Sequence, residues 1–243
     1  MIPKIIHYIW FGGKPFPDKV QKCIDSWHKY LPDYKYILWN EDTFDVNSVA
    51  FTRQAYAHKK WAFVSDYVRM YALNKYGGWY LDTDVEILRP IDAFENHRMV
   101  LGTDHEGALT ALMASEPGHP YWTEMIDYYN SLSFIHEDGS FNMVVNNTRL
   151  QQVLKSYGYV FENKYQQLAC GIVVYPDDYF HVANVEKGTL HKTENSYAIH
   201  WHTLLWTSQM THFYRWLRLH IFKPLLGEDN FLKVWLGIKK IFK

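Results

Sequence analysis

Residues 62–84 read AFVSDYVRMYALNKYGGWYLDTD, and in them a helix pattern, a glycine pair and a strand pattern follow one another. Apolar or aromatic residues recur near every 3.6 positions from residue 61 to residue 76, which predicts a helix. Gly77 and Gly78 end this helix, because glycine accepts the positive φ of a helix C-terminus. The apolar run at 79–81 is typical of a short strand, and Asp82 and Asp84 follow it directly. We therefore expect both carboxylates where a buried strand ends.

This stretch carries two groups of charged residues. Asp82 and Asp84 make a hard, oxygen-rich pair that suits Mg²⁺ or Mn²⁺ bridging to phosphate oxygens. Asp66 and Arg69 are three residues apart on the predicted helix and so lie on one face, among apolar neighbours. An ion pair that faces a core is costly unless something uses it. Two interpretations stay open: a pair that joins helix to sheet, and a pair that binds a ligand.

The combination resembles the DXD sugar-transferase signature of glycosyltransferase family 32. The residues that match are Ser65, Asp66, Arg69, Tyr76, Gly77, Gly78, Tyr80, Leu81, Asp82 and Asp84. The resemblance implies a GT-A fold, a nucleotide-sugar donor such as a UDP-sugar, a divalent metal and retention of the anomeric configuration. It also implies that Asp82 and Asp84 hold the metal, that Asp82 touches the donor ribose, and that Asp66 and Arg69 bind the transferred sugar and its phosphate.

The N-terminal strand pattern matches the same family. Residues 2–13 read IPKIIHYIWFGG, and by resemblance Trp10 stacks on the base of the donor. A tryptophan that caps a core strand is the alternative interpretation of Trp10.

The family's usual C-terminal motif is matched only in part. Ala198-Ile199-His200 and Trp206 align with it, but His202 and Leu205 stand where the family has Trp and Ser. A histidine at a strand end is suited to complete a Mn²⁺ shell opposite two carboxylates. The third metal ligand is therefore left between His200 and His202, with His200 preferred, and Trp206 is expected to close over the donor sugar.

The order of predicted elements indicates an α/β fold. Strands are expected at 5–10, 34–39, 79–81, 85–88, 99–104, 108–114, 171–175 and 196–200, and helices at 17–30, 61–76, 121–132 and 148–157, the last capped by Thr148. Alternating strands and helices predict a Rossmann-like, mostly parallel sheet flanked by helices, in which ligands bind at the carboxyl ends of strands. Trp10, Asn40 and Asp82 all fall at such ends. We expect one GT-A type domain at 1–206 and a helical, basic extension at 207–243.

Composition sets further bounds. Aromatic residues make up 18% of the 243 residues, a surplus that suits flat ligands or a core packed with rings. Cys23 and Cys170 are expected to be reduced core thiols. No apolar run reaches the length of a membrane span, and the N-terminus is not expected to be a signal peptide.

The charge is unevenly distributed along the chain. Residues 211–243 hold seven Lys or Arg against two acidic residues, a charge of +5, whereas the rest of the chain carries −6. Apolar residues at 231, 234, 235, 238 and 242 form one stripe of a predicted amphipathic helix, which favours an anionic membrane surface. The alternative is a terminal helix that packs on the core. We expect an enzyme in the cytoplasm, peripheral at the inner face of a bacterial membrane, with no nucleic-acid partner.

These observations favour a metal-dependent, retaining hexosyltransferase in capsule or O-antigen synthesis. Its saccharide acceptor is expected to be lipid-linked. The hexose is expected to be glucose, galactose or an N-acetyl derivative. A haloacid-dehalogenase-like phosphatase is a rival, because Asp82 and Asp84 also fit the D-x-D part of its motif, although that motif normally opens the domain. A carbohydrate-binding module that uses the aromatic surplus is a second rival. Sugar, linkage, acceptor and oligomeric state do not follow from the sequence.

Overall fold

A seven-stranded mixed sheet is the centre of the protein. The computed structural model describes residues 1–104, 107–144, 146–184 and 189–203, together with 216, 221 and 223–227. The strand order is β2-β1-β3-β6-β5-β8-β7. The strands are β1 (Ile5–Ile9), β2 (Lys35–Trp39), β3 (Gly78–Leu81), β5 (Met99–Asp104), β6 (Gly107–Ser115), β7 (Gln166–Gln167) and β8 (Ile172–Tyr175). The strands β2, β1, β3, β5 and β8 run in one direction, and β6 and β7 run against them.

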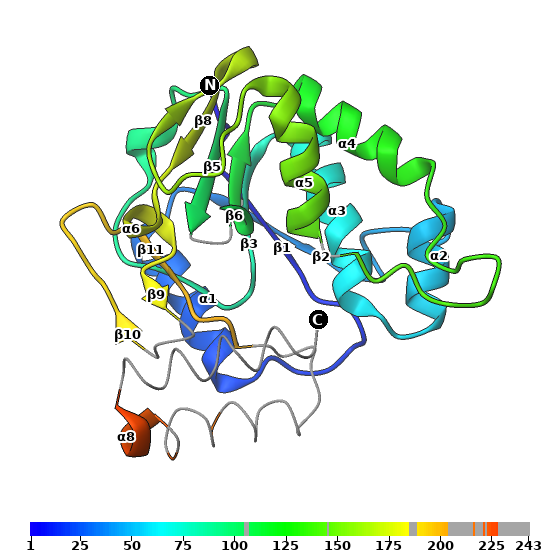
Figure 1. The fold of residues 1–243 in the computed structure, drawn as a ribbon, viewed down its shortest axis with the longest axis horizontal. Helices are drawn as coiled ribbons and strands as arrows, with labels where there is room; N and C mark the ends of the chain where they lie inside the picture. Colours follow the sequence, from blue (N-terminus) through cyan, green and yellow to red (C-terminus); the bar gives the residue numbers. More distant parts are fainter. Residues whose placement is uncertain are drawn as a thin grey trace. The chain divides into compact units, whose positions relative to one another are not determined.

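Helices cover both faces of this sheet (Figure 1). They are α1 (Asp18–Tyr30), α2 (Ala50–Ala57), α3 (Trp61–Tyr76), α4 (Pro120–Asn130), α5 (Asn146–Leu154) and the short α6 (Asp177–Phe180). Neighbouring residues of a strand point to opposite faces, so Tyr80 packs with the α2–α5 side while Trp79 and Leu81 pack with the α1 side. The predicted α/β sheet flanked by helices is confirmed.

The residues after the DTD turn leave the main sheet. The Val85 N–H donates to the Asp82 carbonyl at 2.9 Å, which closes a turn over residues 82–85. The next strand, β4 (Val85–Ile87), then pairs antiparallel with β11 (Ala198–His200) in a separate two-stranded sheet. The Trp27 indole N–H donates to the Val85 carbonyl at 2.7 Å and ties β4 to α1. The predicted strand at 85–88 is therefore found as β4, but it pairs outside the main sheet because the turn redirects the chain.

Three further predictions differ from the structure. Helix α5 begins at Asn146, so Thr148 lies inside it and is not its N-cap. Helix α2 was not predicted, since its eight residues give only two turns of pattern. Cys170 is exposed, with a φ of 58°, whereas Cys23 is buried as expected.

The chain divides into two compact units. One comprises Met1–Val182 with Lys192–His200, and the other Ala183–His191 with Trp201–Lys243. The second unit contains the strands β9 (Ala183–Asn184) and β10 (Thr189–Leu190), which pair antiparallel, and the helix α8 (Lys223–Leu226). The predicted domain boundary after residue 206 stays a prediction. Trp206 and nearly all of the predicted amphipathic extension lie outside the described residues. Within the described part of the chain, no helix is both long and apolar enough to cross a membrane.

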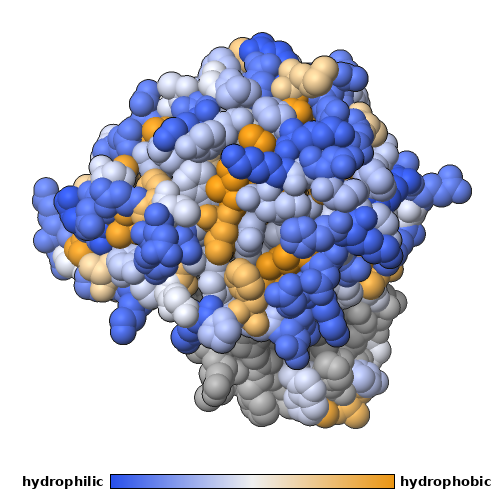
Figure 2. Space-filling model, turned by 180° about the vertical axis from the view of Figure 1, so that it is seen from behind, coloured by the Kyte–Doolittle hydropathy of each residue, from blue (hydrophilic) through white to orange (hydrophobic). Residues whose placement is uncertain are grey.

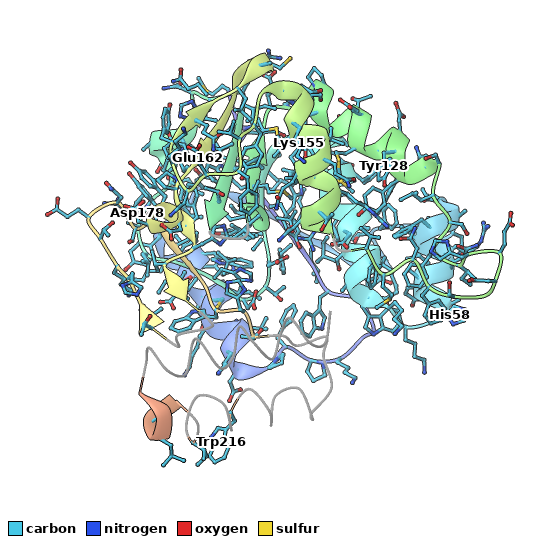
Figure 3. The ribbon with its side chains drawn as sticks, in the orientation of Figure 1. His58, Tyr128, Lys155, Glu162, Asp178 and Trp216 are labelled. Carbon is cyan, nitrogen blue, oxygen red and sulfur yellow. The ribbon has the colours of Figure 1, made fainter. Side chains whose placement is uncertain are left out.

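On the face shown in Figure 2, hydrophobic residues form small groups among hydrophilic ones. Tyr128 lies on α4 and Lys155 just beyond α5 (Figure 3). Buried side chains of α2, α3, α4 and α5 form one cluster with those of β3, β5 and β6, so these helices are packed against the sheet.

The glycine pair between α3 and β3 is required by geometry. Gly77 ends α3 with a φ of 61°, and Gly78 opens β3 with a φ of 94°. A Cβ atom on Gly78 would stand 2.7 Å from the carbonyl oxygen of Ile5 on the neighbouring strand β1. Only glycine satisfies both the backbone conformation and this close approach.

We expect Gly78→Ala to destabilise the protein by about 2–4 kcal/mol, since it combines a left-handed backbone with a steric clash at a central strand. Chemical denaturation measures the loss. Gly118→Ala is the matched control, because Gly118 also has a positive φ of 68° but nothing lies within 4 Å of its Cβ position. Equal losses for the two variants would contradict the role given to the Ile5 contact.

Candidate active site

Asp82 and Asp84 lie at the carboxyl end of β3, as predicted. The Asp82 N–H donates to the Ala111 carbonyl on β6 at 2.7 Å, so sheet pairing continues one residue past the strand. The turn that follows holds Asp84 in place, and its side chain is buried while Asp82 keeps 27% of its side chain exposed. The two carboxylates thus share a partly open position at the edge of the sheet.

His200 joins this pair through the small β4–β11 sheet. The antiparallel register sets His200 opposite Val85, the residue after Asp84. Its Nε2 lies 3.4 Å from the Asp84 carboxylate oxygen Oδ1. One ligand atom each from Asp82, Asp84 and His200 lies within 4.8 Å of the others, a spacing that a single metal ion could fill. The two carboxylates suit Mg²⁺ or Mn²⁺, and the imidazole adds a nitrogen ligand that favours Mn²⁺.

Arg69 occupies the centre of the site. Its guanidinium is buried, with Nη2 at 3.3 Å from Asp66 Oδ1 and Nη1 at 3.4 Å from Asp82 Oδ1. The same side chain donates to the carbonyls of Ser65, at 3.2 Å, and Thr110, at 3.0 Å. Arg69 joins α3 to β6, as the structural interpretation of the Asp66–Arg69 pair expects. It also contacts Asp82 of the DTD turn, so the same arrangement is compatible with ligand binding.

Tyr80 adds a contact that sequence reasoning did not assign to the site. Its hydroxyl donates to Asp82 Oδ1 at 2.5 Å, and its ring lies 4.7 Å from the Arg69 guanidinium carbon. Asp82 therefore accepts from a phenol and faces a guanidinium. Side chains of a strand alternate between its two faces, so Tyr80 and Asp82, two residues apart, share a face. This spacing is the sequence signal for the contact.

The pKa values of these groups are shifted by burial and by one another. Burial raises the pKa of Asp66 to about 6, although the charge of Arg69 opposes this. Burial also raises the pKa of Asp82, opposed by Arg69 and reinforced by the charge of Asp84. Burial lowers the pKa of His200, but the adjacent Asp84 carboxylate outweighs it and the net pKa is raised above 6.5. A cation between Asp82 and Asp84 would relieve the unfavourable environment that these shifts report.

Trp10 follows β1 and is half-buried. Its indole N–H donates to the Lys14 carbonyl at 2.6 Å, and the ring of Phe16 meets its ring edge-on at 5.1 Å. The indole is thus fixed in orientation by its own loop. The sheet-end position that the sequence predicts for Trp10 is confirmed, while the predicted stacking on a base stays a prediction.

Glu41 secures the glycine loop beside Trp10. Its carboxylate accepts from the Gly12 N–H at 2.8 Å and from the Tyr56 hydroxyl at 3.0 Å. The loop at residues 11–13 is thereby tied to α2, a helix that sequence reasoning did not predict. No local pattern identifies Glu41, because its partners come from two distant segments.

Two predicted site residues stay predictions. Trp206 lies outside the described residues. His202 belongs to the other compact unit and has a positive φ of 47°. His200, the preferred candidate for the third metal ligand, lies beside Asp82 and Asp84.

Residues 17–101 match a family described as "glycosyltransferase sugar-binding region containing DXD motif". The chain is 33% identical over 134 residues to inositol phosphoceramide mannosyltransferase 3 of Schizosaccharomyces pombe, covering 51% of this chain and 36% of the relative. It is 32% identical over 144 residues to mannosyl phosphorylinositol ceramide synthase CSH1 of Saccharomyces cerevisiae, with coverages of 52% and 35%. The chain thus spans little more than a third of the length of these relatives, which are yeast proteins and not the expected bacterial capsule or O-antigen enzymes.

A solved structure titled PaToxG glycosyltransferase resembles this chain with a TM-score of 0.49 and 21% sequence identity, covering 64% of this chain and 68% of that one. The family match is the stronger finding, since it includes α1, β2, α3, β3 and the DTD turn. Residues 17–101 are therefore similar to glycosyltransferase sugar-binding regions of the DXD type.

Proposed function

We propose that this protein is a metal-dependent, retaining glycosyltransferase of the GT-A type that moves a hexose from a nucleotide diphosphate to a saccharide acceptor. One observation supports it most: the buried Arg69 links Asp66 to Asp82, directly beside the cluster of Asp82, Asp84 and His200. The match of residues 17–101 to the DXD family and the relatives named as mannosyltransferases support the same reaction class.

Asp82, Asp84 and His200 would hold a divalent cation. Such an ion, when bound, supplies positive charge that stabilises the diphosphate leaving group. Arg69 adds a second positive charge whose position is fixed by the Ser65 and Thr110 carbonyls. A guanidinium that is already oriented needs no reorganisation while charge develops on the phosphate oxygens.

Asp66 would bind hydroxyl groups of the transferred sugar. With a pKa of about 6, its carboxylate is ionised at neutral pH and accepts hydrogen bonds. Trp10, whose indole N–H is already bonded to its own loop, would offer its ring face to the donor base. No residue is assigned as a nucleophile, because retention in this family is attributed to the leaving phosphate assisting the acceptor on the same face of the sugar.

The identity of the transferred sugar and of the acceptor is proposed on narrower grounds than the reaction class. The relatives are named for mannose transfer, so nucleotide-linked mannose belongs beside UDP-glucose, UDP-galactose and their N-acetyl forms in a first donor screen. We propose a saccharide acceptor carried on a lipid, as in surface polysaccharide synthesis. Metal-dependent release of nucleotide diphosphate from one of these donors supports the proposal. Release of phosphate from simple esters with none from any donor would favour the phosphatase.

Asp84→Asn should lower transferase activity by about 10²–10³-fold, because it removes one negative charge from the metal ligands. Calorimetric titration with Mn²⁺ should show the matching loss of affinity, while the melting temperature without metal at pH 8 stays unchanged or rises. Asp33→Asn, at an exposed aspartate on another part of the chain, is the control. Near-normal transfer by Asp84→Asn would remove the DTD turn from the mechanism.

The affinity for Mn²⁺ should fall as the pH is lowered through the pKa of His200, which lies above 6.5. Protonated imidazole cannot ligate a metal, so each bound ion must displace one proton below that pKa. The affinity should then drop about tenfold per pH unit. The protonated His200–Asp84 pair stabilises the metal-free protein at the same low pH, so the rise in melting temperature on adding Mn²⁺ should be larger at pH 8 than at pH 6. His200→Asn should flatten this dependence; an unchanged slope would exclude His200 as a ligand.

We also propose that the enzyme works at a membrane surface on the cytoplasmic side. The charge of +5 in residues 211–243 and the apolar stripe predicted from residue 231 to 242 support this. The protein should sediment with phosphatidylglycerol vesicles and be released by high salt. Deletion of residues 230–243 should abolish sedimentation and leave donor hydrolysis in solution intact. Undiminished vesicle binding by the truncated protein would contradict the proposal, and so would its unfolding, which would show a helix packed on the core.

A further inference from the structure

A cavity of about 560 Å³ lies on the far side of α3 from the DTD turn. It is bounded by the loop after β2, the N-terminal end of α2, one face of α3 and the last residue of α4. His58, labelled in Figure 3, marks the other, C-terminal end of α2. The volume falls within the range of small-molecule sites, about 300–1,000 Å³.

Aromatic rings form one wall of this cavity. Tyr67 and Tyr71 are four residues apart and so lie on one face of α3. The ring of Phe44 packs against both, at 6.1 Å from Tyr67 and 5.4 Å from Tyr71. Phe44 and Tyr67 are buried, which fixes the wall, and Tyr71 is half-buried, which leaves part of its ring to the cavity.

Polar groups form the opposite side. Asp45 is exposed and its Oδ1 accepts from the Asn47 N–H at 2.9 Å, which orients the carboxylate. Asn130 accepts from the Tyr67 hydroxyl through Oδ1 at 3.3 Å, and this leaves its amide nitrogen as a donor. Ser48 contributes a hydroxyl, and Val49 and Ala50 bring the first turn of α2, which has no side-chain cap.

The cavity is separate from the candidate active site. At 100° per residue, the Tyr67–Tyr71 face and the Asp66–Arg69 face of α3 point about 150° apart. Residues of the DTD turn and Trp10 are not among those that line it. A ligand bound there would leave the cluster of Asp82, Asp84 and His200 free for donor and metal.

The chemistry of the lining selects a ligand class. None of the residues that the structure places around the cavity is Lys or Arg, so a phosphate or a carboxylate would lack a partner charge. A carboxylate, an amide, a hydroxyl and uncapped backbone N–H groups together match a molecule with many hydroxyl groups. The aromatic wall matches the apolar face of a sugar ring.

We propose that this cavity is a second carbohydrate site, which binds a neutral saccharide apart from the transferase centre. The aromatic surplus of the sequence is thereby partly explained, since three of its rings meet here. The proposal does not depend on the transferase activity, because the site needs neither metal nor nucleotide.

Saturation-transfer NMR with mannobiose, maltose, cellobiose and lactose tests it, in the presence of EDTA so that metal plays no part. At least one disaccharide should bind at millimolar concentration. Tyr71→Ala should weaken that binding about tenfold, the equivalent of one lost ring contact. Tyr71→Phe should retain it, and so should Tyr165→Ala, at an exposed tyrosine elsewhere on the chain. Asn130→Leu, at the exposed end of α4, gives a second test should Tyr71→Ala fail to fold.

Asp84→Asn separates the two sites. Binding should be unchanged in this variant, because Asp84 does not line the cavity. The proposal is overturned if no disaccharide binds to the wild type, if Asn130→Leu binds as well as the wild type, or if Asp84→Asn abolishes binding. Binding of adenosine or uridine in place of the saccharides, lost in Tyr71→Ala, would also overturn it and would show a nucleoside site.

Discussion

The arrangement of the site depends on one buried cation. Arg69 approaches two carboxylates and donates to two carbonyls, and its guanidinium lies against the ring of Tyr80. Replacing a buried ion pair by apolar side chains is often neutral or stabilising. Arg69 is therefore not explained by folding stability alone. It aligns α3, β3 and β6 at the point where the DTD turn leaves the sheet.

The central sheet explains why polar groups gather at that point. The strands β1, β2 and β3 run parallel, so their carboxyl ends lie at the same edge. Strand β6 runs against them and pairs with β3, which brings the Thr110 and Ala111 carbonyls to the same edge. The separate β4–β11 pairing then adds His200, which lies more than a hundred residues later in the sequence than Asp84. Parallel pairing, antiparallel pairing and the separate β4–β11 sheet thus bring polar groups to the same region.

The elements that the sequence predicts correctly are those where local pattern and position agree. The helix Trp61–Tyr76 was predicted with its observed bounds, because a long apolar period and a glycine pair mark both its body and its end. The DTD turn was placed at a strand end for the same reason. Thr110 and Glu41 were missed, since their roles arise from segments that the chain brings together only on folding. The short helix α2 and the start of α5 were missed or misplaced because two turns of helix hold too little pattern.

The glycines and the aspartates of the Tyr-Gly-Gly-x-Tyr-Leu-Asp-x-Asp stretch are required for different reasons. Gly78 is required because a side chain would strike the backbone of β1, a constraint that exists whatever the protein binds. Asp82 and Asp84 carry no comparable steric demand. Selection for folding and selection for chemistry therefore act on different residues of the same motif. A descendant that lost its chemistry would be expected to keep the glycines while its aspartates drift, so glycines alone identify the scaffold and only the aspartates distinguish a working enzyme from an inactive copy.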